Sequence, residues 1–198
     1  MTDHFALLNE PRRPWLDADS LKQKFRALAA EFHPDKIHSA GEAEKNLAAK
    51  RFADLNAAFN CLAEPKSRLL HLLELELGAK PEDIQQIPAA LADRFAEVAN
   101  TCRAADKFLT EKSQVTSPLL QVQLFGRAQE WIERLQTLQR KLDGLHAQLL
   151  DELKSADAVW PSAARPESLA RIEELYRLFS YFNRWNRQLQ ERITRLSL

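Results

Sequence analysis

Hydrophobic residues recur along most of this chain at steps of three and four, the spacing of one face of an α-helix. The first stripe of this kind comprises Leu21, Phe25, Leu28 and Phe32. Pro34 cannot continue a helix and disfavours helical backbone at the residue before it, so we predict that this helix ends near His33. Asp17 is a good N-cap for the start of the same helix.

A second helical run is expected from about residue 42 to residue 62, ending at Pro65. Its predicted buried residues are Leu47, Phe52, Leu55, Ala58, Phe59 and Leu62. The leucine-rich stretch 67–77 predicts one more short helix that is apolar nearly all round. Such a helix needs partners on more than one side, so we interpret it as the joint between two halves of the chain.

Residues 78–88 form the candidate boundary, with Gly78, Pro81 and Pro88 as helix breakers. Three long stripes follow it, with Pro118 suited to the first turn of the second helix. The stripes are Leu91, Phe95, Val98, Cys102, Ala105 and Leu109; then Trp131, Leu135, Leu138, Leu142, Leu145 and Leu149; then Ile172, Leu175, Phe179, Phe182, Asn186, Leu189, Ile193 and Leu196. They predict an antiparallel three-helix bundle, and hence an all-α chain with domains 1–77 and 78–198.

Composition supports this fold class and narrows the functions. Hydrophobic residues make up 45% of the 198 residues and there are 4 glycines, which favours helices around ordinary cores. The formal net charge of +0 gives no global electrostatic reason to expect nucleic acid or an acidic membrane as partner. Two solitary cysteines, no membrane-spanning apolar run and no signal peptide at the start predict a reducing, cytoplasmic location.

The sequence offers little for catalysis. His33 and Asp35 stand two residues apart on a predicted loop, too close for the usual relay, and no nucleophile with a base lies nearby. There is no glycine-rich phosphate loop and no metal-ligand spacing such as Cys-x-x-Cys, and Cys61 and Cys102 lie in helical patterns. We therefore expect no enzyme activity, no cofactor and no bound metal.

The context of His33-Pro34-Asp35 is more informative than the tripeptide. A basic helix ending in an aromatic residue precedes it, and a helix ending Leu55-Asn56-Ala57-Ala58-Phe59, with Leu62, Pro65 and Arg68 beyond, follows it. Over roughly residues 3–77 the chain resembles the J-domain, since the motif, both flanks and their spacing agree. That resemblance implies a helical hairpin that docks on a DnaK-type chaperone and stimulates its ATP hydrolysis.

Carried over by position, the resemblance makes His33, Pro34 and Asp35 the trigger of that ATPase. The chaperone-binding residues on and near the preceding helix are then Lys22, Phe25, Arg26 and Lys36. The basic residues would steer an acidic surface, although Ala27 stands where many J-domains have another base. Alternatively, Phe25 is core, and Lys22, Lys24, Arg26 and Lys36 form a merely solvated face.

The absence of a glycine-rich linker or zinc module after residue 77 narrows the resemblance to the HscB family of iron–sulfur assembly co-chaperones. The resemblance implies that the first bundle helix binds the iron–sulfur scaffold protein. The matching positions are Leu91, Phe95, Asp93 and Glu97, whereas Ala92, Ala96 and Ala99 replace larger or acidic residues. Leu91 and Phe95 could instead face the bundle core.

Three hypotheses stay open at this point. The protein delivers the iron–sulfur scaffold protein to a DnaK/HscA-type chaperone, or it is a J-protein with a different client, or it is a helical adaptor with a degenerate motif. None of them requires a cofactor, nucleic acid or a membrane.

Overall fold

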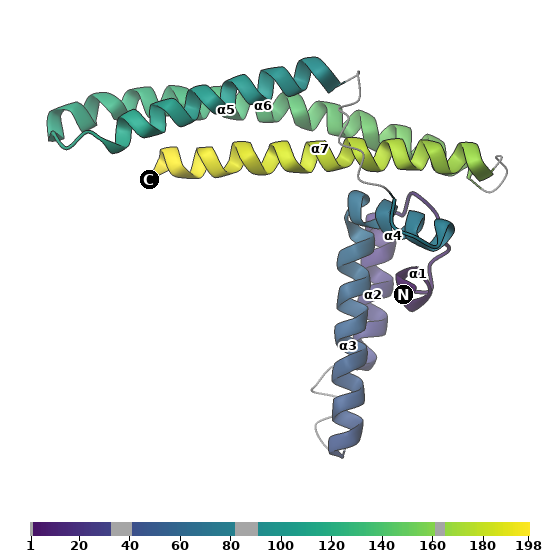
Figure 1. Ribbon diagram of the computed structural model, residues 1–198. Coiled ribbons are helices and arrows are strands. Elements are labelled where there is room, and N and C mark those ends of the chain that lie inside the picture. Colours follow the sequence, from purple (N-terminus) through teal and green to yellow (C-terminus); the bar gives the residue numbers. More distant parts are fainter. Residues whose placement is uncertain (1, 33–40, 82–90, 161–164) are drawn as a thin grey trace. The chain divides into compact units, whose positions relative to one another are not determined.

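The computed structural model describes residues 2–32, 41–81, 91–160 and 165–198, and its regular secondary structure within these ranges is helical (Figure 1). The helices are α1 (His4–Leu7), α2 (Ala18–Glu31), α3 (Glu42–Ala63), α4 (Pro65–Leu77), α5 (Ala92–Ser113), α6 (Pro118–Val159) and α7 (Arg165–Ser197). The all-α fold class expected from the sequence is thus confirmed.

The helix ends follow the capping residues. Asp17 is the N-cap of α2, and its side chain accepts a hydrogen bond of 2.8 Å from the Ser20 amide. Pro65 opens α4, where the Glu64 carboxylate accepts from the Ser67 amide, and Pro118 opens α6. Gly78 ends α4 with φ +71°, a left-handed conformation that favours glycine. The predicted cap at Asp17 and the predicted start at Pro118 are therefore confirmed, whereas α4 begins two residues before the predicted stretch 67–77.

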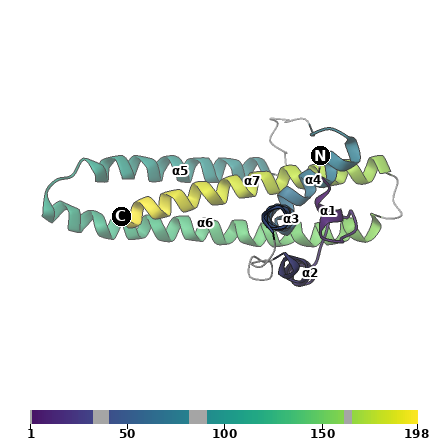
Figure 2. The same cartoon turned by 90° about the horizontal axis from the view of Figure 1, so that it is seen from below.

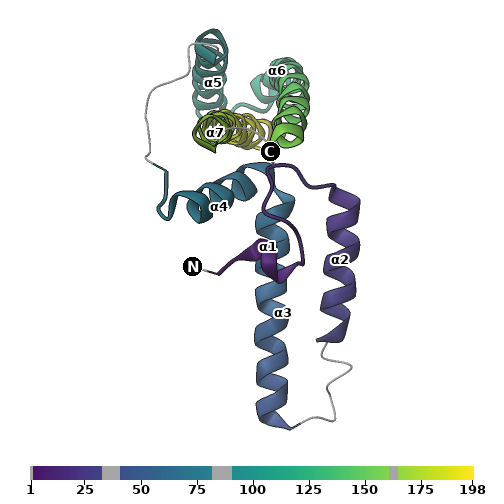
Figure 3. The same ribbon diagram turned by 90° about the vertical axis from the view of Figure 1, so that its right-hand side faces the viewer.

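In the N-terminal part, α2 and α3 run side by side as a hairpin, and α1 and α4 also pack against α3 (Figure 3). These four helices share a core of apolar side chains. Its fully covered members are Phe5, Leu8, Leu21, Ala58, Leu62, Leu69, Leu72 and Leu73. The helix pairing and this core make the N-terminal part a self-consistent packing unit around α3.

Leu47 is the clear error in the predicted core of this part, because its side chain is 58% exposed. The buried residue at that level of α3 is Ala48, and the stripe continues through Leu55, Ala58 and Leu62. Leu47 lies about 100° around the helix from Ala48, which turns it away from the stripe that α2 covers.

The three-helix bundle is confirmed for α5 and the stretches of α6 and α7 that run alongside it (Figure 2). Most of the predicted stripe residues are buried, including Val98, Leu135, Phe179 and Phe182. The departures are Phe95, which is 41% exposed, and three half-buried side chains: Trp131, Leu145 and Asn186. Ion pairs between helices add to the apolar seam, with Lys141 on α6 2.9 Å from Glu97 on α5 and Arg192 on α7 2.5 Å from Asp106 on α5.

The described residues group into two compact units that do not follow the chain strictly. One combines the residues before 83 with 151–177, and the other combines 83–150 with 178–198. Asp157 of α6 explains part of the first grouping, since it accepts hydrogen bonds from the Arg13 side chain and, at 3.1 Å, from the Trp15 amide. The division of the chain into folding domains 1–77 and 78–198 stays a prediction.

None of the helices within the described ranges is both long and apolar enough to cross a membrane.

Arg68 on α4 is a buried cation, with 3% of its surface exposed. Its Nε donates to the Pro14 carbonyl at 2.7 Å and its Nη1 donates to the Leu62 carbonyl at 2.6 Å. Burial lowers the pKa of this guanidinium to about 10, so the group remains charged at neutral pH. It therefore supplies a charged donor to two buried carbonyls.

Replacing Arg68 by Met is expected to destabilise the protein by about 2–4 kcal/mol, because two buried carbonyls lose a charged donor while the apolar stem is kept. Urea unfolding followed by circular dichroism measures this difference. Arg26→Met is the matched control, since Arg26 is exposed on α2 and its loss should change stability by less than about 0.5 kcal/mol. Equal stability of Arg68→Met and the parent protein would contradict the role assigned to these bonds.

Candidate functional site

The sequence places His33, Pro34, Asp35 and Lys36 between α2 and α3, and all four lie outside the described residues. What the structure describes is the helix that leads into them. The α2 helix ends at Glu31, with Phe32 as its C-cap, and α3 begins at Glu42. The described part of the candidate docking site is therefore the surface of α2.

Lys22 and Arg26 are exposed on α2. They are four residues apart, so they lie on one face of the helix and one turn separates them. The intervening Lys24 has a different environment, because it is half-buried, lies 2.8 Å from the Glu10 carboxylate and donates to the Asn9 carbonyl at 3.5 Å. Lys24 thus ties α2 to the preceding segment, which leaves Lys22 and Arg26 as the accessible cations.

Phe25 is half-buried, and its ring stacks on Phe59 of α3 with centroids 4.5 Å apart and an angle of 20° between the planes. This contact gives Phe25 a packing role that joins the two helices of the hairpin. It also fixes the rotation of α2 about its axis, because Phe25 must face α3. At the end of α2, Arg51 of α3 lies over the Phe32 ring, 5.8 Å from its centroid.

The second candidate surface lies at the start of α5. Phe95 and Asp93 are exposed there, whereas Leu91 is buried, with 6% of its surface accessible. Ala92 and Ala96 are exposed beside them. The sequence prediction grouped Leu91 with Phe95, but the structure separates them, with one side chain in the core and the other at the surface.

Glu97, the remaining residue predicted at this surface, is half-buried between two cations. Its carboxylate lies 2.9 Å from Lys141 on α6 and 2.7 Å from Arg94 on α5. Hydrogen bonds from Lys141 and Arg94, together with their charges, hold the pKa of Glu97 below its ordinary value. Its negative charge is therefore largely matched within the protein.

An open groove of about 680 Å³ runs between α5 and α6, and Glu97 belongs to its lining. From α5 it is lined by Glu97, Asn100, Thr101 and Ala104, and from α6 by Glu130, Trp131, Glu133, Arg134, Thr137, Leu138 and Lys141. Arg134 lies over the Trp131 ring, 5.1 Å from its centroid. The groove thus combines an aromatic ring with charges of both signs, a lining suited to an amphipathic protein segment. Because Trp131 belongs to a hydrophobic stripe, the sequence predicted it in the core and did not predict this groove.

Side chains of metal-ligating types also come together in the N-terminal part, although the sequence predicted no metal site. His4, Cys61 and His71 each offer a ligand atom, and these atoms lie within 4.8 Å of one another. They belong to three different helices, so no spacing along the chain could have revealed them.

Comparisons with known protein families and sequences match the chain to J-domain co-chaperones. Residues 3–71 match the DnaJ domain. A co-chaperone protein HscB homolog from Paraburkholderia phytofirmans is 34% identical over 119 residues, which cover 54% of this chain and 67% of that protein. The HscB homolog from Burkholderia pseudomallei is 36% identical over 80 residues, covering 39% of this chain and 46% of that protein.

Solved structures agree on the fold. The crystal structure of the human co-chaperone protein HscB has a TM-score of 0.61 and 17% identity, and the match covers 96% of this chain and 81% of that one. The chaperone HscB from Vibrio cholerae has a TM-score of 0.52 and 20% identity, and the match covers 96% of both chains. At these identities the likeness speaks for the arrangement of helices alone.

The ion pairs of Glu97 predict a pH-dependent contribution to stability. Since the folded-state pKa lies below the ordinary 4.5, the contribution is present above that pH and is lost as the pH falls through the folded-state pKa. Glu97→Gln is therefore expected to lower the free energy of unfolding by about 0.5–1 kcal/mol at neutral pH and by less at an acidic pH below 4.5.

Urea unfolding of both proteins at the two pH values measures this difference. Lys141→Met serves as the paired variant, because it removes one of the two partners and should reduce the effect of Glu97→Gln. A difference between parent and Glu97→Gln that persists unchanged in acid would contradict the electrostatic origin.

Proposed function

The chain belongs to the HscB family of J-domain co-chaperones, and from that premise we propose that it stimulates the ATPase of a DnaK/HscA-type chaperone and delivers an iron–sulfur scaffold protein to it. The protein is then a co-chaperone of an Hsp70-type partner in iron–sulfur cluster assembly. The observation that carries the proposal is the exposed pair Lys22 and Arg26 on the helix that leads into His33-Pro34-Asp35.

In this proposal the His-Pro-Asp motif acts on the active site of the partner. Asp35 supplies a charged acceptor for a cationic group of the ATPase, and such charge-assisted hydrogen bonds are stronger than neutral ones. Pro34 restricts the backbone before docking, so that less conformational entropy is lost on binding. His33 and Lys36 complete the contact set carried over from the J-domain.

Lys22 and Arg26 provide the electrostatic part of docking. The net charge of the chain is zero, so a local pair of accessible cations, and not the overall charge, must attract an acidic partner surface. The stack of Phe25 on Phe59 supports this role, because it turns Phe25 toward α3 while Lys22 and Arg26 stay in solvent. Phe25 therefore contributes by orienting the docking helix, with its remaining exposed edge available to the partner.

The scaffold protein is proposed to bind along the start of α5 and the adjoining groove. Phe95 is an exposed aromatic residue, and buried aromatic anchors commonly carry much of the energy of a protein interface. Trp131 in the groove offers a second apolar surface, while Asp93 offers an exposed negative charge in the first turn of α5. Leu91 supports this surface from the core, and Glu97 shapes the groove through its ion pairs.

A different client remains the second candidate, and the exposed alanines favour it. Ala92 and Ala96 stand beside Phe95, where a larger or acidic residue would widen or charge the contact area. The smaller side chains leave a surface of different shape and lower charge. Capture of the Hsp70-type chaperone together with a protein other than the scaffold would support this second candidate.

The first function test is Asp35→Asn, which keeps the size of the side chain and removes its charge. We expect stimulation of the chaperone ATPase to fall by about 10-fold or more, the loss that corresponds to one charge-assisted hydrogen bond. Steady-state phosphate release by the chaperone, with and without the co-chaperone, measures it. Asp54→Asn is the matched control, since Asp54 is exposed on α3 and has no proposed contact.

Full stimulation by Asp35→Asn, or equal losses with Asp54→Asn, would rule out the trigger role. Scaffold binding by Asp35→Asn should be unchanged, so this experiment separates the chaperone from the client.

The client surface is tested by Phe95→Ala, which is expected to weaken scaffold binding by about 10-fold or more if Phe95 is an anchor. Isothermal titration with the purified scaffold protein measures the affinity. Phe125→Ala is the matched control, because Phe125 is another exposed phenylalanine of the bundle, 73% accessible on α6, and lies outside the proposed surface at the start of α5. A loss that is equal at both positions, or absent at Phe95, would reject this surface while leaving the chaperone role intact.

A further inference from the structure

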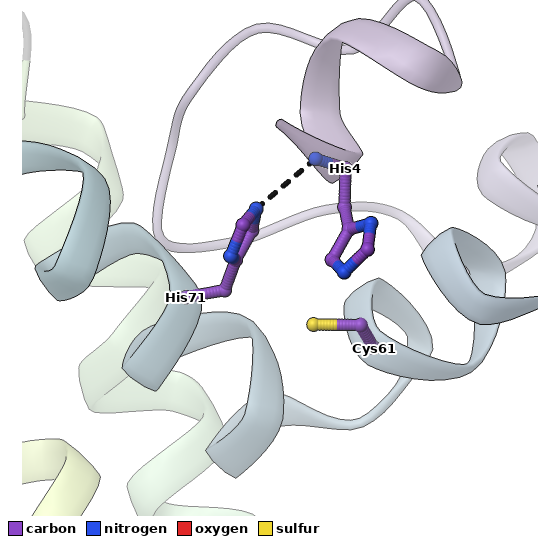
Figure 4. Close-up of side chains that lie close together, drawn as sticks. All are labelled: His4, Cys61 and His71. Atoms are coloured by element: carbon purple, nitrogen blue, oxygen red, sulfur yellow. Dashed lines mark hydrogen bonds between the residues drawn. The ribbon is translucent and has the colours of Figure 1, made fainter. Parts of the chain in front are cut away.

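His4, Cys61 and His71 meet where α1, α3 and α4 pack together, and their side chains point toward one another (Figure 4). One nitrogen from each imidazole and the Cys61 sulfur all lie within 4.8 Å of one another. Among the described residues, this is the group of His, Cys, Asp and Glu side chains that meets the geometry of an ion site. None of its three residues lies on α2 or α5, the helices that carry the proposed docking residues.

Two imidazole nitrogens and one thiolate make a borderline-soft donor set, the kind that Zn²⁺ binds in proteins. Three protein ligands leave the fourth tetrahedral position for water. We propose that His4, Cys61 and His71 form a Zn²⁺ site that joins α1 to α3 and α4. The role is structural, because the ion would link the short first helix to two longer ones.

The separations are compatible with an ion after a small adjustment. Bonds of about 2.0–2.1 Å to nitrogen and about 2.3 Å to sulfur put tetrahedral ligand atoms about 3.5 Å apart. The widest pair is at most 4.8 Å apart, so the side chains must close by about 1 Å. Rotation of the half-buried His4 ring on α1, a helix of four residues, supplies that freedom.

Both imidazoles are placed as ligands require. His71 is 5% exposed, with the Phe5 ring stacked 5.8 Å away and the His4 ring 4.5 Å away. A metal ion binds the neutral form of an imidazole, and the His71 ring already accepts a hydrogen bond from the His4 amide, which requires a ring nitrogen without a proton. His4 Nδ1 is buried and has no hydrogen-bond partner among the described residues.

Two existing hydrogen bonds compete with the ion. The His4 amide donates to His71 Nε2 at 3.0 Å, which puts the proton of the neutral His71 ring on Nδ1. The Cys61 thiol donates to the Ser67 carbonyl at 3.6 Å. Binding therefore displaces the thiol proton and rearranges one ring, so the site is selective for a cation that bonds well to sulfur.

The electrostatic surroundings favour a dication over a bare thiolate. The carboxylates of Glu74 and Glu64 lie near enough to Cys61 to act on it electrostatically. The same two carboxylates attract Zn²⁺, which would also neutralise the thiolate. The cations nearby are already engaged, Arg12 by Asp3 at 2.7 Å and Arg68 by two backbone carbonyls.

The test uses the full-length protein after treatment with a chelator, with Co²⁺ as the probe and Zn²⁺ as the competitor. We expect one equivalent of Co²⁺ to give the near-ultraviolet absorption of a cobalt–thiolate bond, and Zn²⁺ to abolish that absorption. Cys61→Ser should remove the band and weaken Zn²⁺ binding by about 100-fold or more, since even changes outside the ligand shell can cost 10–100-fold. Cys102→Ser is the matched control, because Cys102 is a buried cysteine of α5 outside this cluster.

Thermal unfolding gives an independent readout. Zn²⁺ should raise the melting temperature of the parent and of Cys102→Ser, because an ion that binds only the folded state stabilises it, but not that of Cys61→Ser. If Cys61→Ser does not fold, His4→Gln takes its place, since His4 is half-buried on the surface side of the cluster. Absence of the cobalt–thiolate band in the parent, or a band that survives unchanged in the folded ligand variant, would overturn the site.

Discussion

The buried guanidinium of Arg68 is the contact on which the N-terminal part of the molecule depends. It reaches from α4 to the Pro14 carbonyl and to the Leu62 carbonyl near the end of α3. A carbonyl that is removed from water needs a donor, and the segment before α2 has no regular secondary structure to supply one at Pro14. Arg68 therefore fixes the position of the chain just before α2, whose N-cap is Asp17.

A second buried polar side chain, that of Asp157, also holds the segment before α2. Asp157 of α6 is 4% exposed and accepts from the Arg13 side chain and the Trp15 amide, while the Trp160 indole donates to the Arg12 carbonyl at 3.0 Å. Residues 12–15 are thus held by polar groups from α4 and from the end of α6. This explains why residues 151–177 share a compact unit with the N-terminal helices, although the sequence assigns them to the bundle.

The sequence predicted the helices but not the contacts between residues that are far apart in the chain. Prolines 65 and 118, the cap Asp17 and the three-and-four stripes act within a few residues, so local pattern predicted where helices begin and end. Whether Leu47 or Ala48 faces inward depends on which side α2 covers, a fact outside the local pattern. The pairing of Arg13 with Asp157, and the meeting of His4 with Cys61 and His71, arise only when distant helices pack.

The α4 helix connects these observations, although it carries none of the residues proposed to touch a partner protein. Arg68 and His71 are three residues apart, so they lie on one face of α4. Arg68 holds Pro14, and His71 accepts from the His4 amide, so the segment between them is anchored near both ends. Lys24 of α2 in turn pairs with Glu10 inside that segment. These polar contacts on α4 hold the segment that leads into α2, and the stack of Phe25 on Phe59 fixes the rotation of α2, so the exposure of Lys22 and Arg26 follows from packing inside the N-terminal part.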